Sequence, residues 1–113
     1  NPVLALFAGA PNWKIATLGL LVVFVGPFFE EIIFRGWLFK ALQRTRPGLW
    51  IALPASTLIF ALLHSFYSPG GIAVIALLGA GLGWLRWRYD QLWLCVAAHA
   101  AYNGLTLTMV ALA

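Results

Sequence analysis

The sequence predicts an all-α protein, a polytopic bundle of about four transmembrane helices, and three observations lead to this fold class. Of its 113 residues, 63% are hydrophobic and only 9% are charged, against about 25% charged residues in an ordinary soluble domain. Residues 47–85 and 91–113 contain no Lys, Arg, Asp or Glu, and an uncharged apolar run of about 18 or more residues can cross a bilayer as a helix. Runs such as Leu18–Val25 are apolar at every position, in contrast to the alternating polarity of barrel strands.

We expect four spans, which run from about Lys14 to Lys40, Trp50 to Tyr67, Gly71 to Trp87 and Gln91 to Ala113. The first is expected to be broken or bent near Gly26-Pro27, and the second has Pro54 near its start. Ser68-Pro69-Gly70-Gly71 is a strong turn signal between the second and third spans. Small residues spaced for close helix contact in lipid occur in the last two spans: Gly79, Gly81 and Gly83 in the third, and Ala97/Ala101 and Ala100/Gly104 in the fourth.

Residues 1–113 are expected to form a single membrane-embedded core without a soluble domain, because a chain of this length cannot bury so much apolar surface from water. It begins at Asn1 and shows no basic segment followed by a cleavage site. We therefore expect it to be truncated at the N-terminus, with further helices upstream.

The basic residues predict how the spans are oriented. Five of the seven lie near two connections, at Lys40, Arg44, Arg46, Arg86 and Arg88. The positive-inside rule makes loops 40–48 and 86–90 cytoplasmic, and tryptophans flank both loops as an aromatic belt does. The basic residues form no stripe with interleaved polar residues, so nucleic acid is not an expected partner. The expected partner is the lipid bilayer, and the short loops favour a compact protein of a bacterial cytoplasmic membrane.

Acidic residues inside a span need an explanation, because an ionisable group costs a few kcal/mol there. Glu30 and Glu31 stand side by side in the first span. Glu31 and Arg35 are four residues apart and can form an ion pair on one helix face. Glu30 is rotated by about 100° from Glu31, so it needs another partner.

Other polar groups in the later spans are candidate partners for Glu30. His64 follows Phe60 by four residues, and His99 precedes Asn103 by four, so each pair is expected on one helix face. Glu30 lies ten residues before Lys40 and His99 eight after Gln91, which places both roughly 12–15 Å from the same membrane edge. We therefore expect these polar side chains to meet inside the bundle.

Three sequence patterns together resemble a known family. Residues 30–35 read EExxxR, residues 60–64 read FxxxH, and residues 99–103 read HxxxN. In this order, each within an apolar segment, they resemble the CPBP family, which comprises CAAX prenyl endopeptidases and related bacterial bacteriocin-processing or self-immunity membrane proteins. The resemblance covers nearly the whole chain, and no motif position departs from it.

The resemblance implies an intramembrane protease without a cofactor, in which a glutamate activates water. Carried over, Glu30 is the general base and His64 helps to hold the water. His99 and Asn103 polarise the scissile carbonyl and stabilise its oxyanion, while Arg35 fixes Glu31. Phe60, the first residue of its motif, is expected to give structural support. The substrate is a membrane-anchored peptide or protein, either a prenylated C-terminal tail or, for bacterial relatives, a leader peptide, a pheromone or a sorting tail.

Three alternatives stay open on the sequence. Glu30, His64 and His99 are also possible zinc ligands, with an activated water in the fourth position. In a non-catalytic scaffold or immunity protein the polar cluster would only hold the helices together. A transporter would use the buried carboxylates as a proton relay, although no broken-helix repeat is visible.

Overall fold

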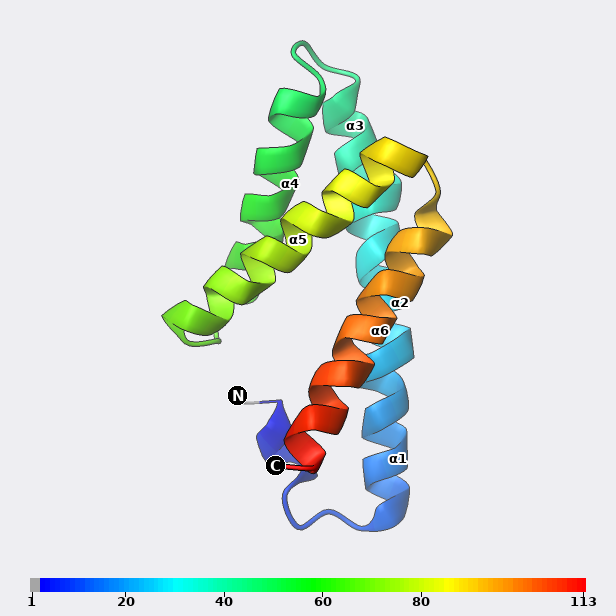
Figure 1. The fold of residues 1–113 in the computed structure, drawn as a ribbon, viewed down its shortest axis with the longest axis vertical. Helices are drawn as coiled ribbons and strands as arrows, with labels where there is room; N and C mark the ends of the chain where they lie inside the picture. The colour runs from blue at the N-terminus through cyan, green and yellow to red at the C-terminus, as the bar shows by residue number, and fades with distance from the viewer. Residues whose placement is uncertain (1–2) are drawn as a thin grey trace.

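The computed structural model describes residues 3–113, and this part of the chain is helical, with no strand. The order of elements, shown in Figure 1, is a 3₁₀ turn at Leu4–Phe7, α1 Asn12–Leu20, the π-helical stretch η2 Leu21–Val25, α2 Gly26–Glu31, the π-helical stretch η3 Ile32–Leu38, α3 Phe39–Gln43, α4 Leu49–Leu62, α5 Pro69–Tyr89 and α6 Leu92–Ala111. The predicted all-α class is confirmed.

The first expected span is one continuous helix, Asn12–Gln43, in which α1, α2 and α3 are joined through the two π stretches. The helix is not interrupted near Gly26-Pro27. Instead, the residues just before Gly26 form the wider π-helical turn η2. Proline has no N–H to donate to the preceding turn, and the Gly26 N–H bonds to the Leu21 carbonyl five residues back. The helix thus accommodates Pro27 by a local π turn, a feature frequent at functional sites.

Helix α4 is shorter than expected. It begins at Leu49, contains Pro54 in its interior and ends at Leu62, whereas the sequence predicted a span to Tyr67. Beyond the helix the chain turns, because the His64 N–H bonds to Ala61 O at 3.0 Å and the Tyr67 N–H to His64 O at 3.0 Å. His64 therefore lies in a turn, and its expected place on a helix face shared with Phe60 is wrong.

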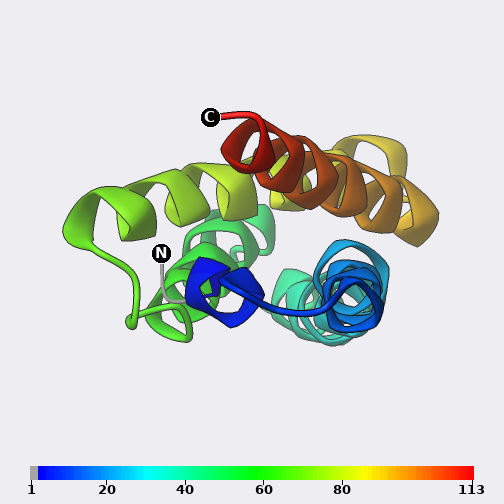
Figure 2. The ribbon, with the colours of Figure 1, turned by 90° about the horizontal axis from the view of Figure 1, so that it is seen from below.

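Helices α5 and α6 lie in one layer, and the long helix with α4 lies in the other (Figure 2). Helix α5 crosses α4 and α3 obliquely, and α6 returns beside α2 and the two π stretches (Figure 1). Helix α5 begins at the predicted turn, where the Ser68 hydroxyl accepts a bond from the Gly71 N–H at 3.1 Å. It ends at Asp90, whose φ of 52° lies in the left-handed region.

Three helices among the described residues are long and apolar enough to cross a membrane: Asn12–Gln43, Pro69–Tyr89 and Leu92–Ala111. Helix α4 has 14 residues, which corresponds to about 21 Å and is less than a hydrocarbon core of about 30 Å. The chain is therefore a membrane protein with three helices long enough to span and one shorter apolar helix, α4, in place of the second expected span.

Glycines of α5 allow the two layers to approach closely. A Cβ added at Gly79 would lie 3.0 Å from Phe60 and 3.3 Å from Arg35, and one at Gly83 would lie 2.8 Å from Leu53. Gly81 has no atom of another element within 4 Å. The predicted role in close packing thus holds for Gly79 and Gly83 but not for Gly81.

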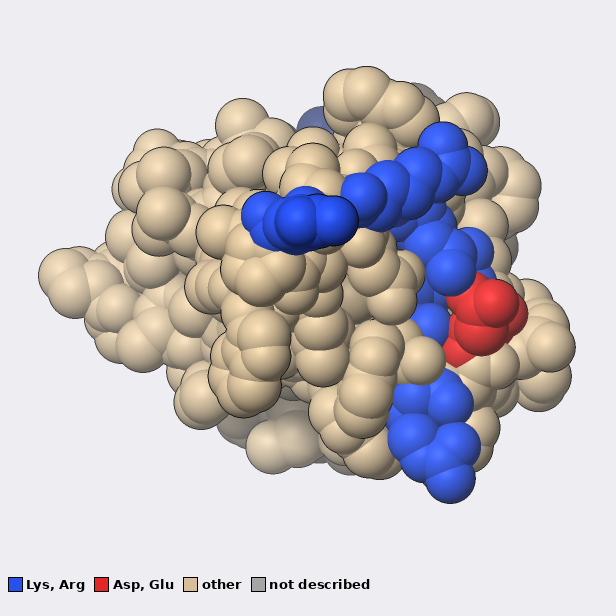
Figure 3. Space-filling view, turned by 90° about the horizontal axis from the view of Figure 1, so that it is seen from above, with Lys and Arg blue, Asp and Glu red and all other residues tan. Residues whose placement is uncertain are grey.

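Lys and Arg side chains gather at the end of the bundle that carries the α3–α4 and α5–α6 connections. Figure 3 looks onto this end and shows a basic band across the face, with acidic atoms beside it. Lys40 and Arg86 both form ion pairs with Asp90. A hydrogen bond from Lys40 lowers the pKa of the Asp90 carboxyl, which lies outside the helices.

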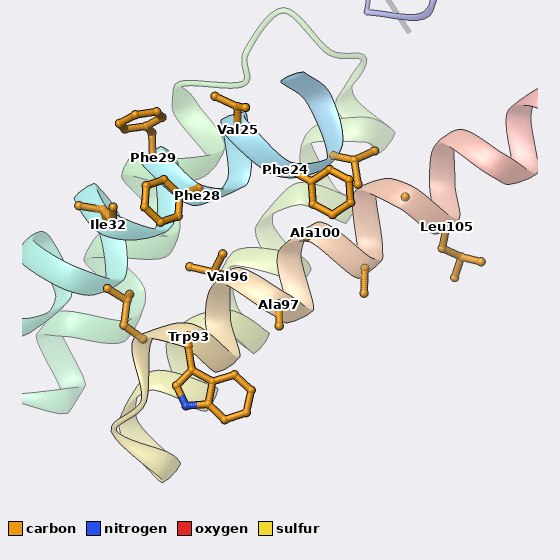
Figure 4. A pocket seen from close by; sticks show the side chains of 14 residues that line it. Phe24, Val25, Phe28, Phe29, Ile32, Trp93, Val96, Ala97, Ala100 and Leu105 are labelled. Atoms are coloured by element: carbon orange, nitrogen blue, oxygen red, sulfur yellow. The ribbon is translucent and has the colours of Figure 1, made fainter. Parts of the chain in front are cut away.

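An apolar groove of about 1160 Å³ runs along the outside of the seam between the long helix and α6 (Figure 4). Aromatic residues of the long helix, including Phe24 and Phe28, line one wall. The small residues of α6 that the sequence assigned to close helix contact line the other: Ala97, Ala100, Ala101 and Gly104. They line this groove, and a Cβ added at Gly104 would lie 3.5 Å from Val23 of the long helix.

Candidate active site

The two adjacent glutamates at the end of α2 have different environments. Glu31 is fully buried, whereas the Glu30 side chain is 37% exposed. This contrast follows from their rotation by about 100° around the helix, which turns Glu31 into the bundle and Glu30 toward a pocket. The different burial agrees with the prediction that Glu31 faces into the bundle toward Arg35 while Glu30 points elsewhere.

Arg35 holds Glu31, as the spacing predicted. Its Nη1 donates to Glu31 Oε2 at 3.0 Å, and both side chains are fully buried. Its Nη2 donates to Gly79 O at 2.7 Å, and the guanidinium lies 4.6 Å from the centre of the Phe60 ring. Arg35 therefore ties the long helix to α5 and to the end of α4.

His99 of α6 lies between the two glutamates. Its Nδ1 is 2.9 Å from Glu31 Oε2, and its Nε2 is 3.5 Å from Glu30 Oε2. The ring is 3% exposed. The sequence indicated that His99 and Glu30 lie at one depth, but it did not indicate the contact with Glu31, because the rotation of α6 against α2 is not encoded in either motif.

His64 approaches Glu30 from the opposite side. Its Nε2 is 3.9 Å from Glu30 Oε1, and its Nδ1 is 2.7 Å from Phe60 O. A carbonyl oxygen only accepts hydrogen bonds, so Nδ1 carries a proton and Nε2 is the nitrogen that faces Glu30. In this way the turn after α4 brings His64 into the site although it is not on the helix.

Asn103 is held by the backbone of η2. Its Nδ2 donates to Val22 O at 2.9 Å. That carbonyl has no helical donor four or five residues on, because the Gly26 N–H bonds to Leu21 O and Pro27 has no N–H. The π turn before Pro27 thus leaves the Val22 carbonyl free to accept from Asn103. The sequence analysis did not predict this bond, and a proline within a helix was the one feature that could have indicated it.

Phe60 is 1% exposed and packs against three aromatic rings of the site. Ring centroids lie 4.7 Å from His64, 5.9 Å from His99 and 5.2 Å from Phe34. This arrangement fits the expected supporting position of Phe60, because its buried ring packs against both imidazoles of the site.

A pocket of about 580 Å³ contains Glu30, His64, His99 and Asn103 in its lining. The structure therefore brings together all four residues that the sequence singled out, from the long helix, the turn after α4, and α6. The remaining walls are mostly apolar and include residues that the sequence reading did not identify: Val22, Pro27, Tyr67, Val74, Ile75, Leu78, Tyr102 and Leu107. An exposed carboxylate, two imidazoles and an amide in such a cleft suit hydrolysis of a bond carried by an apolar chain.

The family model for type II CAAX prenyl endopeptidase Rce1-like proteins matches residues 12–105. The chain belongs to this family. No curated protein and no solved structure matches the chain. Membership places it among membrane proteases, with a membrane-associated substrate. The matched region includes the EExxxR, FxxxH and HxxxN motifs, so the resemblance inferred from these motifs to the CAAX protease-like family is confirmed.

The candidate zinc ligands Glu30, His64 and His99 lie close together but not as a metal site. Among residues 3–113, no group of three or more His, Cys, Asp or Glu side chains is arranged to hold a metal ion. The Nε2 atoms of His64 and His99 face different oxygens of Glu30, at 3.9 and 3.5 Å. In this geometry one carboxylate lies between two imidazoles, with each imidazole nearest to a different oxygen.

Proposed function

We propose that this chain is the core of an intramembrane endopeptidase of the CAAX-protease type, which hydrolyses a peptide bond in a membrane-anchored or prenylated protein or peptide. The observation that carries this proposal is the position of Glu30, partly exposed in a pocket with apolar walls and flanked by His64 and His99. A general base needs to lie within reach of the proton that it removes, directly or through one water.

In the proposed reaction Glu30 and His64 hold the attacking water. The neutral His64 ring offers the Nε2 lone pair, and Glu30 offers a carboxylate oxygen 3.9 Å away. One water proton passes to Glu30 while the water oxygen bonds to the scissile carbonyl carbon. Glu30 then returns the proton to the leaving nitrogen as the C–N bond breaks, so the enzyme ends in its starting state.

Asn103 is the proposed donor to the oxyanion. One Nδ2 hydrogen is bonded to Val22 O, which fixes the amide, and the second hydrogen is available to a substrate oxygen. A donor of this kind contributes roughly 3–4 kcal/mol to the transition state. His99 is the second proposed donor, through Nε2, and can donate from that atom only when it carries a proton there.

Glu30→Gln tests the proposal. Glutamine has nearly the shape of glutamate but does not accept a proton, so turnover per folded molecule should be abolished. The measurement is single-turnover cleavage of a panel of membrane-anchored peptides, prenylated and unprenylated, by the reconstituted protein with and without chelator. Chelator-sensitive cleavage would identify the zinc-dependent alternative.

Asn103→Ala is the matched variant for the same assay. It should bind substrate with nearly unchanged KM and turn over roughly 10²–10³ more slowly, whereas Glu30→Gln should show no turnover. Full turnover in the Glu30→Gln protein would contradict the role of Glu30 as the base, whereas no cleavage by the wild-type protein across the panel would favour a scaffold, in which the polar cluster only joins helices.

We also propose that the basic loops 40–48 and 86–90 face the cytoplasm of a bacterial cell. A cysteine label at Thr45 should then react from the cytoplasmic side and one at Ser68 from the other side, each in a background lacking Cys95. The basic residues at one end of the bundle motivate this orientation. Reaction of both labels from the same side would contradict it.

A further inference from the structure

Both ring nitrogens of His99 face carboxylate oxygens, and the two carboxylates belong to neighbouring residues. Nδ1 lies 2.9 Å from Glu31 Oε2, and Nε2 lies 3.5 Å from Glu30 Oε2. The first distance is that of a charge-assisted hydrogen bond, and the second is longer. Glu31 is therefore the closer partner of His99, a contact that a role limited to pairing with Arg35 does not account for.

The partner of Glu31 decides which nitrogen of His99 carries a proton. Glu31 Oε2 accepts from Arg35 Nη1 at 3.0 Å, and both residues are fully buried. The same oxygen, Glu31 Oε2, accepts from Arg35 and faces His99 Nδ1, and a carboxylate oxygen only accepts hydrogen bonds. Nδ1 of His99 must then be the donor, which leaves Nε2 as the nitrogen that gains or loses a proton in front of Glu30.

Charge counting within the bundle indicates where a further proton lies. Ionised Glu30, Glu31 and Arg35 together carry one net negative charge, and His99 is the only basic group among residues 3–113 that contacts both carboxylates. The other ionisable group beside Glu30 is His64, whose Nδ1 is already occupied by Phe60 O. One proton shared between Glu30 and Nε2 of His99 makes the cluster neutral, which a membrane-spanning bundle favours.

We propose that Glu31 is a positioning residue of the active site, which acts through His99 by fixing its proton on Nδ1 and directing Nε2 toward Glu30. The inference rests on the proposed function of Glu30 as the base. With the shared proton on Nε2, Glu30 is a free carboxylate that takes the proton of water, and His99 donates to the oxyanion. With Nδ1 bare and the proton on Nε2, the ring would lose its short bond to Glu31 and keep only the 3.5 Å contact with Glu30.

Nitrogen NMR of the reconstituted chain tests the inference directly. The protein contains two histidines, His64 and His99, so ¹⁵N-histidine labelling gives two rings, and the spectrum of a His64→Gln protein assigns them. We expect His99 to carry a proton on Nδ1, whether the ring is neutral or doubly protonated. A wild-type His99 with a bare Nδ1 and a proton on Nε2 alone would overturn the inference without any variant being needed.

The Glu31→Met/Arg35→Met double variant separates positioning from support of the fold. Replacing a buried ion pair by apolar residues of similar volume is often neutral for stability, so the double variant avoids the unpaired charge that either single change would leave. We expect its His99 ring to shift toward the Nε2–H tautomer and kcat to fall by about 10²-fold or more with little change in KM, as a wrong histidine tautomer can cost up to about 10⁴-fold.

The matched control is Lys40→Met/Asp90→Asn, which removes an ion pair outside the pocket and should leave the His99 spectrum and kcat unchanged. A folded Glu31→Met/Arg35→Met protein with wild-type kcat would overturn the positioning role. The two proposals fail separately, because full turnover of the Glu30→Gln protein rejects the base, while the tautomer of His99 in the wild-type spectrum does not depend on turnover.

Discussion

Two clusters of ionic side chains join the helices of this protein, and they differ in burial more than in geometry. The buried cluster consists of Glu31, Arg35 and His99, and the exposed cluster consists of Lys40, Arg86 and Asp90. Each contains an Arg–carboxylate pair four residues apart with an N–O distance of 3.0 Å. Glu31 and Arg35 are fully buried, whereas the Asp90 side chain is 67% exposed.

The comparison shows that the same local spacing has different consequences at different depths. An exposed pair gains little because water competes for both charges. A buried pair is not intrinsically more stabilising, but removal of one partner is costly because it leaves a charge without compensation. The buried cluster has additional bonds, to Gly79 O and to the His99 ring, and lies beside the candidate base. We therefore expect the buried cluster to control folding and chemistry, and the exposed cluster to adjust the end of the bundle.

The largest effect on stability is expected for Arg35→Met. The change leaves Glu31 with only His99 as a partner inside the bundle, and breaking a buried pair costs about 3–5 kcal/mol. Denaturant unfolding of the reconstituted protein measures this loss. The Glu31→Met/Arg35→Met double variant should recover a large part of it, because no charge is then left unpaired.

An equal loss in the single and the double variant would contradict this account. It would mean that the bond from Arg35 to Gly79 O, rather than the ion pair, accounts for the stability. The two clusters would then differ in their effect on stability because of hydrogen bonds to the backbone, rather than because one ion pair is buried.

A smaller effect is expected for Gly79→Ala, which presses on the buried cluster without changing its charges. The added Cβ would lie 3.0 Å from Phe60 and 3.3 Å from Arg35, and both neighbours are held in place by other contacts. Overpacking of this kind costs about 1–3 kcal/mol, partly offset by a gain of about 1 kcal/mol in helix propensity.

Gly81→Ala is the matched control for this variant. It lies on the same helix with no atom of another element within 4 Å, so only the gain in helix propensity remains and the protein should be unchanged or slightly more stable. Equal stabilisation by the two alanines would show that α5 can shift away from the buried cluster.

Much of the fold and the site could be predicted from local patterns. The apolar runs predicted the helices, the spacing of Glu31 and Arg35 predicted their ion pair, and the pattern HxxxN placed His99 and Asn103 on one helix face. These predictions succeeded because each depends on the helical repeat of a single segment.

Features that depend on helix ends or on the rotation of two helices could not be predicted in this way. The predicted position of His64 on a helix was wrong because α4 ends at Leu62, and the Phe60 carbonyl then bonds to the His64 ring. The bond from Asn103 to Val22 arises from the π turn before Pro27. Neither apolar periodicity nor motif spacing contains this information.

The smallest effect is expected for Asp90→Asn in the exposed cluster. Asparagine tolerates the left-handed backbone that Asp90 adopts at φ 52°, so the change removes the charge without straining the helix end. The hydrogen bond from Lys40 lowers the pKa of Asp90 below its ordinary value of 3.8. A lowered pKa means that the ionised carboxylate is favoured in the folded state, so its contribution to stability is present above pH 3.8 and disappears as the pH falls through the lowered value.

The small difference in stability between wild type and Asp90→Asn should therefore be seen at pH 7, shrink in 1 M salt, where the screening length is about 3 Å, and vanish in acid. Unfolding curves at pH 7 and in acid, each at low and high salt, measure it. A difference that persists in acid or in high salt would show that Asp90 stabilises the α5–α6 connection through its backbone geometry rather than through its charge. The ion pairs of the exposed cluster would then contribute nothing to stability.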